Sequence, residues 1–215
     1  MPDLQTLFAF FGVAVLLGLS PGPDNLFVLV QSAQRGWRVG LCVVLGLCLG
    51  LVGHTTAVAL GLAAMVAASP MLFTAIKLCG AAYLAYLAWG AWRAPISAGG
   101  SVQVRSERDR LTWSSALHWT GRGVLMNLSN PKVLIFFLAF LPQFADPARG
   151  SLAPQVMALG CVFMLATLLV FGSIACGSGL FGRILLRSAR AQRWLNRIAA
   201  TVFGALALRL VMVQR

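Results

Sequence analysis

Two short polar segments, each containing proline, interrupt long apolar stretches of this 215-residue sequence. The first is Ser20-Pro21-Gly22-Pro23-Asp24-Asn25, and the second is Asn127-Leu128-Ser129-Asn130-Pro131-Lys132. Proline removes a backbone donor and clashes with the preceding helical turn, so carbonyl groups around both segments lose their helical partners. If the apolar stretches lie in a bilayer, these groups must face protein or a water-filled cavity. Both segments therefore carry the chemistry of a polar binding site.

Both segments also have the pattern of a helix start. Ser20-Pro21 and Asn130-Pro131 each fit an N-cap followed by proline at the first helical position, which predicts a new half-helix at each. The positive start of a half-helix favours an anion such as a carboxylate, whereas the carbonyls that end the preceding half-helix favour an ammonium. A small zwitterion would satisfy both. The predicted substrate-binding residues are Ser20, Pro21, Gly22, Pro23, Asp24, Asn25, Asn127, Asn130, Pro131 and Lys132.

Asp24 is the one acidic residue deep in an apolar stretch, and Lys132 is the matching cation. An intramembrane carboxylate is a functional candidate by default, so Asp24 is predicted to bind an ammonium or to couple a proton. Alternatively, Asp24 caps the second half-helix or neutralises Lys132. Lys132 either holds a substrate carboxylate, forms a resting ion pair for which substrate and proton compete, or is half of a purely structural pair. Asn25, Asn127 and Asn130 can rescue unpaired backbone and also contact a solute.

Gly46, Gly50 and His54 share one face of the next apolar stretch. His54 is a second candidate for proton coupling, because histidine titrates near neutral pH. It could equally well donate a hydrogen bond to a neighbouring helix. The two glycines are predicted to let another helix approach closely, with dimerisation or lining of the pathway as variants.

The elements that must position these residues are membrane-spanning helices. The chain is 59% hydrophobic and only 10% charged, which excludes a water-soluble fold. We predict an all-α integral membrane protein whose transmembrane helices cover residues 4–34, 39–68, 71–92, 123–143, 153–180 and 198–213. The first apolar stretch has no basic segment before it and no cleavage site after it, so it is predicted to be a span and not a signal peptide.

Basic residues predict the orientation of these helices. Twelve arginines lie in the first, third and fifth connections, whereas the even-numbered connections and the termini hold only Arg149 and Arg215. The positive-inside rule then places both termini on the outer, periplasmic side of a bacterial inner membrane. One set of arginines shares a helical face that suits anionic lipid headgroups, although the same rule alone explains its charge. That set is Arg183, Arg187, Arg190, Arg193 and Arg197.

The chain divides into two halves within a single transmembrane domain. Repeat one covers residues 1–93, a cytoplasmic linker covers 94–121 with a short interfacial helix near Trp113 to Trp119, and repeat two covers 122–215. Three spans precede the linker and three follow, so the second half enters from the opposite side and an inverted repeat is predicted. At 1.5 Å per residue, Pro23 and Pro131 lie roughly 18 and 14 Å from the cytoplasmic ends of their helices. Both breaks are therefore expected near the bilayer midplane.

Several functions are excluded or disfavoured. The net charge of +12 does not indicate nucleic-acid binding, because the sequence lacks the polar surface on which a basic face would lie. The five cysteines are scattered without a C-x-x-C pattern, and no metal-ligand cluster or nucleophile-base motif is visible. We therefore expect no metal, no cofactor and no enzyme activity. A transporter is favoured, and the alternative is a membrane-embedded redox or assembly protein without amino-acid flux.

Five motifs together resemble those of a known family. They are Ser20-Pro21-Gly22-Pro23, Gly46-x-x-x-Gly50-x-x-x-His54, Gly80-Ala81-Ala82-Tyr83-Leu84, Asn127-Leu-x-Asn130-Pro131-Lys132 and Pro142-Gln143-Phe144. Over nearly its whole length the chain resembles the LysE/RhtB family of amino-acid exporters. The resemblance implies a dimeric, six-helix exporter of amino acids or derivatives such as homoserine, homoserine lactone, threonine, leucine or lysine, working by proton antiport. Where many members carry a glycine, this chain has Ala200 and keeps Gly204, so packing there is expected to differ.

Overall fold

The computed structural model describes residues 1–20, 22–68, 70–94, 112–178 and 188–212, and every regular element within them is helical. The long helices are α1 (Leu4–Leu19), α2 (Pro23–Arg35), α3 (Trp37–Ala68), α4 (Pro70–Arg93), α5 (Trp113–Leu128), α7 (Leu152–Cys176) and α9 (Ala189–Met212). The short ones are α6 (Pro131–Ile135), the π-helical η1 (Phe136–Phe140), and the 3₁₀ turns η2 (Leu141–Phe144) and η3 (Pro147–Arg149).

Length and composition support a membrane location for these helices. Within the described residues, α3, α7 and α9 are long and apolar enough to cross a membrane, and the number rises to five if each bent pair is one span. The bent pairs are α1 with α2, at 62°, and α5 with the segment Pro131–Phe144, at 54°. α4 lies where a span was predicted and packs along α9. The all-helical membrane fold is therefore confirmed, while the six-span inverted repeat stays a prediction.

The first break differs from the sequence prediction in its capping. Ser20 is the C-cap of α1, where its backbone N–H donates to the Leu16 carbonyl, and is not the N-cap of a new half-helix. Gly22 takes the N-cap position in an extended conformation, and α2 begins at Pro23. The reason is that a residue before proline is pushed out of the helical region, so in a Pro-Gly-Pro sequence the second proline starts the helix.

The second break agrees with the prediction. Asn130 is the N-cap of α6, its side chain accepts a hydrogen bond of 3.0 Å from the backbone N–H of Lys132, and Pro131 is the first helical residue. The helix before it was predicted from residue 123, but α5 begins at Trp113. Thr112 and Ser115 form a capping box at that start. The predicted interfacial helix and the first part of the predicted span, as far as Leu128, are thus one continuous helix.

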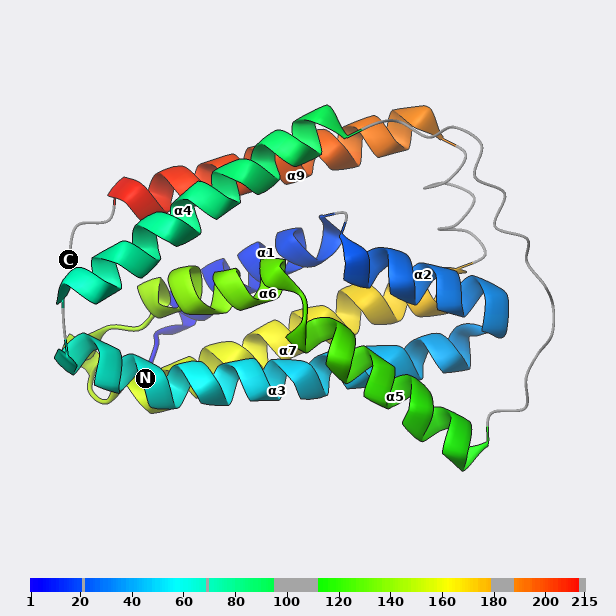
Figure 1. Ribbon diagram of the computed structural model, residues 1–215, viewed down its shortest axis with the longest axis horizontal. Coiled ribbons are helices and arrows are strands. Elements are labelled where there is room, and N and C mark those ends of the chain that lie inside the picture. Colours follow the sequence, from blue (N-terminus) through cyan, green and yellow to red (C-terminus); the bar gives the residue numbers. More distant parts are fainter. Residues whose placement is uncertain (21, 69, 95–111, 179–187, 213–215) are drawn as a thin grey trace.

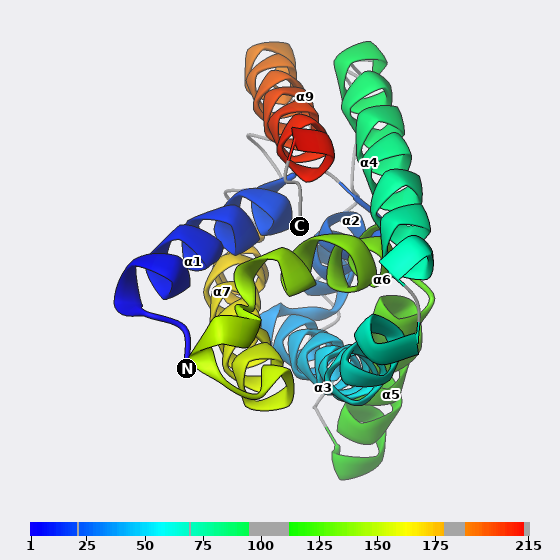
Figure 2. The ribbon, with the colours of Figure 1, turned by 90° about the vertical axis from the view of Figure 1, so that its left-hand side faces the viewer.

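The two bent pairs cross the molecule in opposite directions. In Figure 1, α1 and α2 run away from the end that holds Leu4, whereas α5 and α6 run back toward it, and both pairs break in the middle of the long axis. Figure 2 shows α4 and α9 side by side, set apart from the group formed by the other long helices. The breaks therefore lie inside that group, with α3 and α7 packed beside them.

Arginines lie at the last residue of α2, at the last residue of α4 and in the first turns of α9. α2 ends with Arg35 and α9 begins on the side of the molecule away from the start of α1, whereas α4, which ends with Arg93, stops nearer the middle of the long axis (Figure 1). α9 begins at Ala189 and not at the predicted residue 198, so Arg190, Arg193 and Arg197 belong to it. Arg183 and Arg187 lie outside the described residues.

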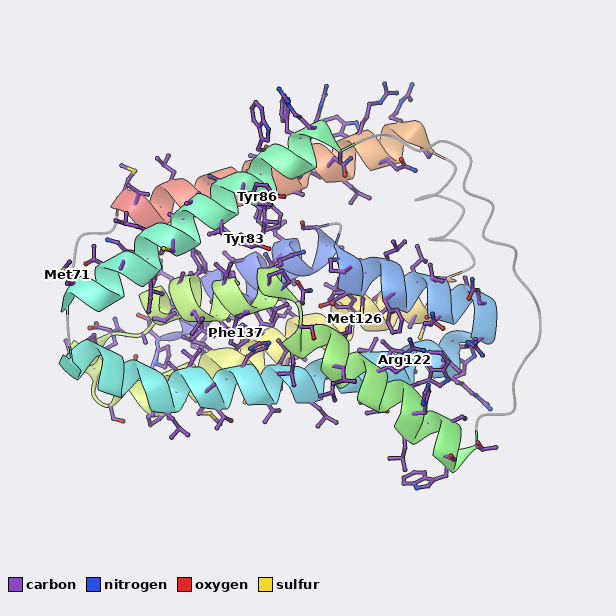
Figure 3. The ribbon with its side chains drawn as sticks, viewed as in Figure 1. Met71, Tyr83, Tyr86, Arg122, Met126 and Phe137 are labelled. Carbon is purple, nitrogen blue, oxygen red and sulfur yellow. The ribbon has the colours of Figure 1, made fainter. Side chains whose placement is uncertain are left out.

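Aromatic rings fill the core between the breaks and the Leu4 end. Six phenylalanines from α1, η1, η2 and α7 have neighbouring ring centroids 5.0–6.3 Å apart, namely Phe10, Phe136, Phe137, Phe140, Phe144 and Phe163. In Figure 3, Phe137 lies between η1 and the neighbouring helices, and its ring centroid is 5.7 Å from that of His54 on α3. The π-helical turn is followed directly by the 3₁₀ turn that contains Pro142, so the predicted helix over residues 123–143 is irregular in its last part.

Candidate functional site

Residues from both breaks line one small cavity. Gly22, Asp24 and Asn25 come from the first break, and Asn127, Asn130 and Lys132 come from the second. The rest of the wall is mainly apolar, with Leu17 and Gly18 of α1, Leu47 of α3, Val133 of α6, and Phe163, Thr167 and Phe171 of α7. The space open to a water-sized occupant is about 20 Å³, which is room for about one water molecule. The cavity is therefore too small for a solute larger than water.

Lys132 crosses the cavity from the second break to the first. Its Nζ donates hydrogen bonds of 2.9 Å to the carbonyl oxygen of Leu17 and 3.0 Å to that of Ser20, and the side chain is only 8% exposed. These carbonyls belong to the end of α1, where the last four carbonyls of a helix lack intrahelical partners. The negative end of the helix dipole stabilises a cation there as well.

Asp24 lies in the first turn of α2 and is 5% exposed. Its neighbours in the cavity are Asn127, Asn130 and Lys132. Among the described residues, its Oδ1 has no hydrogen-bond partner, and the hydrogen bonds of the Lys132 ammonium go to carbonyls and not to this carboxylate. A buried carboxylate oxygen without a partner is costly and is therefore a functional candidate.

Two asparagines satisfy backbone groups at the breaks, as the sequence predicts. The Asn25 side-chain amide donates to the Gly18 carbonyl in the last turn of α1, and Asn130 caps α6. Asn127 differs, since its Oδ1 has no partner among the described residues. Its backbone carbonyl lies 3.3 Å from Nε2 of His54 on α3. The Asn127 side chain is thus left to face the cavity.

Gly46 and Gly50 bring α3 against α5 of the same chain. A Cβ on Gly50 would lie 2.7 Å from Oδ1 of Asn127, and a Cβ on Gly46 would lie 2.8 Å from Cα of Gly123. Contacts this short leave no room for a side chain, so both glycines are needed for the close approach of the two helices. The helix that approaches these glycines in the structure is α5, and their role in packing stays a prediction.

The structure gives the predicted site residues different positions. Gly22, Asp24, Asn25, Asn127, Asn130 and Lys132 line the cavity, Ser20 contributes its carbonyl, and Pro23 and Pro131 start the helices that carry them. Pro21 lies outside the described residues. His54 does not line the cavity, but its Nε2 contacts the backbone carbonyl of Asn127, which does.

Sequence reasoning missed the wall that α7 supplies and the two carbonyl oxygens that hold Lys132. Thr167 gave one usable signal, because it is a polar residue in an apolar stretch and is buried at 5% exposure. The carbonyl oxygens of Leu17 and Ser20 gave none, since backbone acceptors do not depend on residue type.

Charged residues form ion pairs between the start of α1 and η3, near the Leu4 end. The Arg149 guanidinium lies 2.8 Å from the carboxylate of Asp3, the N-cap of α1, and 3.4 Å from that of Asp146 beside η3. Hydrogen bonds from Thr6, followed by the charge of Arg149, hold the pKa of Asp3 below its ordinary value.

The opposite end contains a cation–ring contact on α5. The Arg122 side chain extends from this helix, and its guanidinium lies 5.5 Å from the centre of the Trp119 ring (Figure 3).

Comparison with known proteins gives a consistent match. The model of a family described as LysE type translocator matches residues 15–214. An uncharacterized membrane protein of Vibrio cholerae is 33% identical over 94% of this chain and 94% of its own length. The homoserine/homoserine lactone efflux protein of Salmonella typhimurium is 30% identical, with 91% of each chain covered. A leucine efflux protein of Salmonella choleraesuis is 30% identical over 65% of this chain and 68% of its own. No solved structure shows a significant match.

Proposed function

The chain belongs to the LysE type translocator family and is a membrane transport protein, not an enzyme, and we propose that it exports amino acids by proton antiport. The substrates are neutral zwitterions with an aliphatic side chain, of which leucine and homoserine are examples. The relative named as a leucine efflux protein supports this class, and the relative named as a homoserine/homoserine lactone efflux protein supports it through homoserine. The largely apolar wall supplied by Phe163, Phe171 and Leu47 supports it too, because such a wall suits an aliphatic side chain.

The main support for the proposal is that residues from both breaks line a single cavity, and that this lining includes one carboxylate and one ammonium group. Asp24 and Lys132 are the two charged residues of its lining. Each charge matches one end of an amino acid, and the unpartnered oxygens of Asp24 and Asn127 offer further acceptors. Discontinuous helices that meet in a membrane protein are the usual setting of a transport site.

Transport requires this cavity to open. About 20 Å³ does not accommodate an amino acid, so the conformation described here is closed to substrate. In the proposed cycle, the bent pairs separate first toward the cytoplasm, the site loads an amino acid, and the pairs then rock to open it to the outside.

Asp24 is the proposed coupling group. As substrate leaves to the outside, a proton enters and binds the Asp24 carboxylate, and the proton leaves to the cytoplasm before the next substrate binds. One carboxylate in the site suffices for this exchange, since the proton and the substrate ammonium compete for the same negative charge. In the proposed orientation the termini lie outside a bacterial inner membrane, and the arginine-rich helix ends lie in the cytoplasm near anionic lipid headgroups.

Transport into everted membrane vesicles tests the proposal. Radiolabelled leucine or homoserine should accumulate in vesicles that contain the protein when the lumen is made acidic, and the accumulation should collapse with a protonophore. The Asp24→Asn variant should not accumulate substrate against a gradient, because neither the proton nor the substrate ammonium then meets a negative charge in the site. If Asp24→Asn accumulates substrate as the wild type does, Asp24 is not the coupling group. If neither solute moves, amino-acid export itself is wrong for these substrates.

A further inference from the structure

We infer that the carbonyl oxygens of Leu17 and Ser20, with the Asp24 carboxylate, form the subsite for the substrate's ammonium group, and that the Lys132 ammonium occupies this subsite while the cavity is closed. The inference rests on the proposed function and specifies how the same site distinguishes its substrates. In this arrangement a residue of the chain itself, Lys132, competes with the substrate ammonium for the subsite.

The acceptors fit any primary ammonium group. Nζ of Lys132 donates to Leu17 O at 2.9 Å and to Ser20 O at 3.0 Å. An ammonium group has one positive charge and three donors, and this description holds for lysine and for the amino end of an amino acid alike. Asp24 shares the cavity and supplies the negative charge. The set of acceptors is therefore not particular to Lys132.

Space permits only one ammonium at a time. The cavity has room for about one water molecule, and Lys132 Nζ lies 3.4 Å from where a Cβ on Gly22 would be. A substrate ammonium can reach Leu17 O and Ser20 O only after Nζ withdraws. Withdrawal is feasible because a lysine ammonium sits on a flexible four-carbon chain. The ring of Phe203, 5.5 Å from Nζ, provides a further surface that stabilises a cation.

Charge balance then selects the substrate. The closed site holds the negative Asp24 and the positive Lys132, so it is neutral. A zwitterion keeps it neutral, and its carboxylate becomes the partner of the displaced Lys132 ammonium. A primary amine without a carboxylate would leave two cations with one carboxylate, and an unpaired buried charge is strongly unfavourable. Lys132 therefore favours zwitterions over amines, although the ammonium subsite alone would accept both.

Removing the Lys132 charge should reverse this preference. In Lys132→Met the site keeps Asp24 and the two carbonyls without a resident ammonium, so an amine binds without competition and neutralises the carboxylate. A zwitterion in the same site loses the partner of its own carboxylate. If Lys132 instead served only as a permanent ligand of the substrate carboxylate, the substitution would weaken zwitterion binding without strengthening amine binding.

Equilibrium binding to purified protein in lipid nanodiscs distinguishes these outcomes. The probes are radiolabelled leucine and radiolabelled 3-methylbutylamine, which is leucine without its carboxylate. Wild-type protein should bind leucine at least about tenfold more tightly than the amine, because a buried charge left unpaired costs more than this factor. Lys132→Met should bind the amine at least about tenfold more tightly than the wild type does and should lose the preference for leucine. Lys132→Gln is a second variant with the same expectation, in case the methionine variant does not fold.

Lys77→Met is the matched control, because Lys77 is the other lysine of the chain and does not line the cavity. It should keep the wild-type preference. If amine affinity stays at its wild-type value in the folded Lys132 variants while leucine binding weakens, this inference is overturned and the export proposal stands. If wild-type protein binds leucine and the amine equally, the inference is overturned as well. If it binds neither, the inference falls together with the leucine assignment.

Discussion

Gly46 of α3 and Gly123 of α5 lie directly against each other, so that a Cβ on Gly46 would stand 2.8 Å from Cα of Gly123 and would overlap the Thr120 carbonyl. We expect Gly46→Ala to lower the free energy of unfolding by about 1–3 kcal/mol, because backbone and not a flexible side chain would have to move. Gly61→Ala on the same helix is the control, since nothing lies within 4 Å of its added Cβ. Thermal unfolding of both variants in detergent measures the difference, and equal melting temperatures would contradict the close packing.

Gly50 is one turn further along the same face and should affect function more than stability. A Cβ there would lie 2.7 Å from Oδ1 and 2.8 Å from Cβ of Asn127, so the asparagine side chain would be forced into the cavity it lines. Gly50→Ala should weaken leucine binding by on the order of tenfold or more, since displacements near 1 Å at a site have effects of that size. Gly53→Ala meets only Leu128 at 3.4 Å and should bind leucine normally. Normal binding by Gly50→Ala would show that the position of Asn127 is unimportant.

The two breaks differ in how well the sequence predicts them. At the second break, Asn130 and Pro131 take the predicted capping roles because one asparagine and one proline leave a single arrangement. At the first break two prolines compete, and the restriction on Gly22 before Pro23 moves the helix start past Ser20. The meeting of the two breaks follows from the opposite directions of their helices, which charge and topology alone predict.

Other features of the site depend on packing that no local pattern contains. Gly121 and Gly123 weaken the helical signal before the second break, and yet α5 continues through them because Gly123 packs on Gly46. The π-helical turn of η1 sits among packed rings, where tertiary contacts outweigh local preference. Nζ of Lys132 donates to two backbone oxygens at the end of another helix. The sequence indicates only an oppositely charged partner, Asp24, because backbone acceptors leave no mark on residue type.

The phenylalanine cluster should dominate stability on the Leu4 side of the cavity. Phe136 is fully buried and its ring lies 5.0 Å from Phe140 and 5.4 Å from Phe163. Phe136→Ala should lower the free energy of unfolding by about 3–5 kcal/mol, as truncation of a buried phenylalanine usually does. Phe8→Ala is the matched control, since Phe8 of α1 is 73% exposed and should change stability little. Comparable melting temperatures for the two variants would show that the cluster is not tightly packed.

Asp3 gives a defined pH dependence to the contacts near the Leu4 end. Its pKa is held below its ordinary value of 3.8, first by hydrogen bonds from Thr6 and then by Arg149. A carboxyl group of this kind stabilises the folded state above its ordinary pKa, and the stabilisation is lost as pH falls below that value. The difference in melting temperature between wild type and Asp3→Asn should therefore stay constant from about pH 8 to pH 5 and shrink only below about pH 4.

Arg149, Asp146 and the Met1 amino group also belong to this cluster, but all three remain in Asp3→Asn, so the comparison isolates Asp3. Transport should keep its wild-type pH profile between about pH 5 and 8 in this variant, because the Asp3 carboxyl does not titrate there. A shifted profile would mean that the Leu4 end takes part in proton coupling.

His54 provides the last prediction, because the structure offers it a role that does not involve proton transfer. Its Nε2 lies 3.3 Å from the Asn127 carbonyl, which also accepts a hydrogen bond of 3.0 Å from the backbone N–H of Asn130, and His54 is 6% exposed. If His54 acts by donating this hydrogen bond, His54→Gln should largely preserve transport and its pH profile, because a glutamine amide is also a donor. His54→Leu should lower the free energy of unfolding by about 1–3 kcal/mol through the lost hydrogen bond. If His54→Gln folds stably and binds leucine but no longer accumulates it against a gradient, then the imidazole carries protons and Asp24 does not couple transport alone.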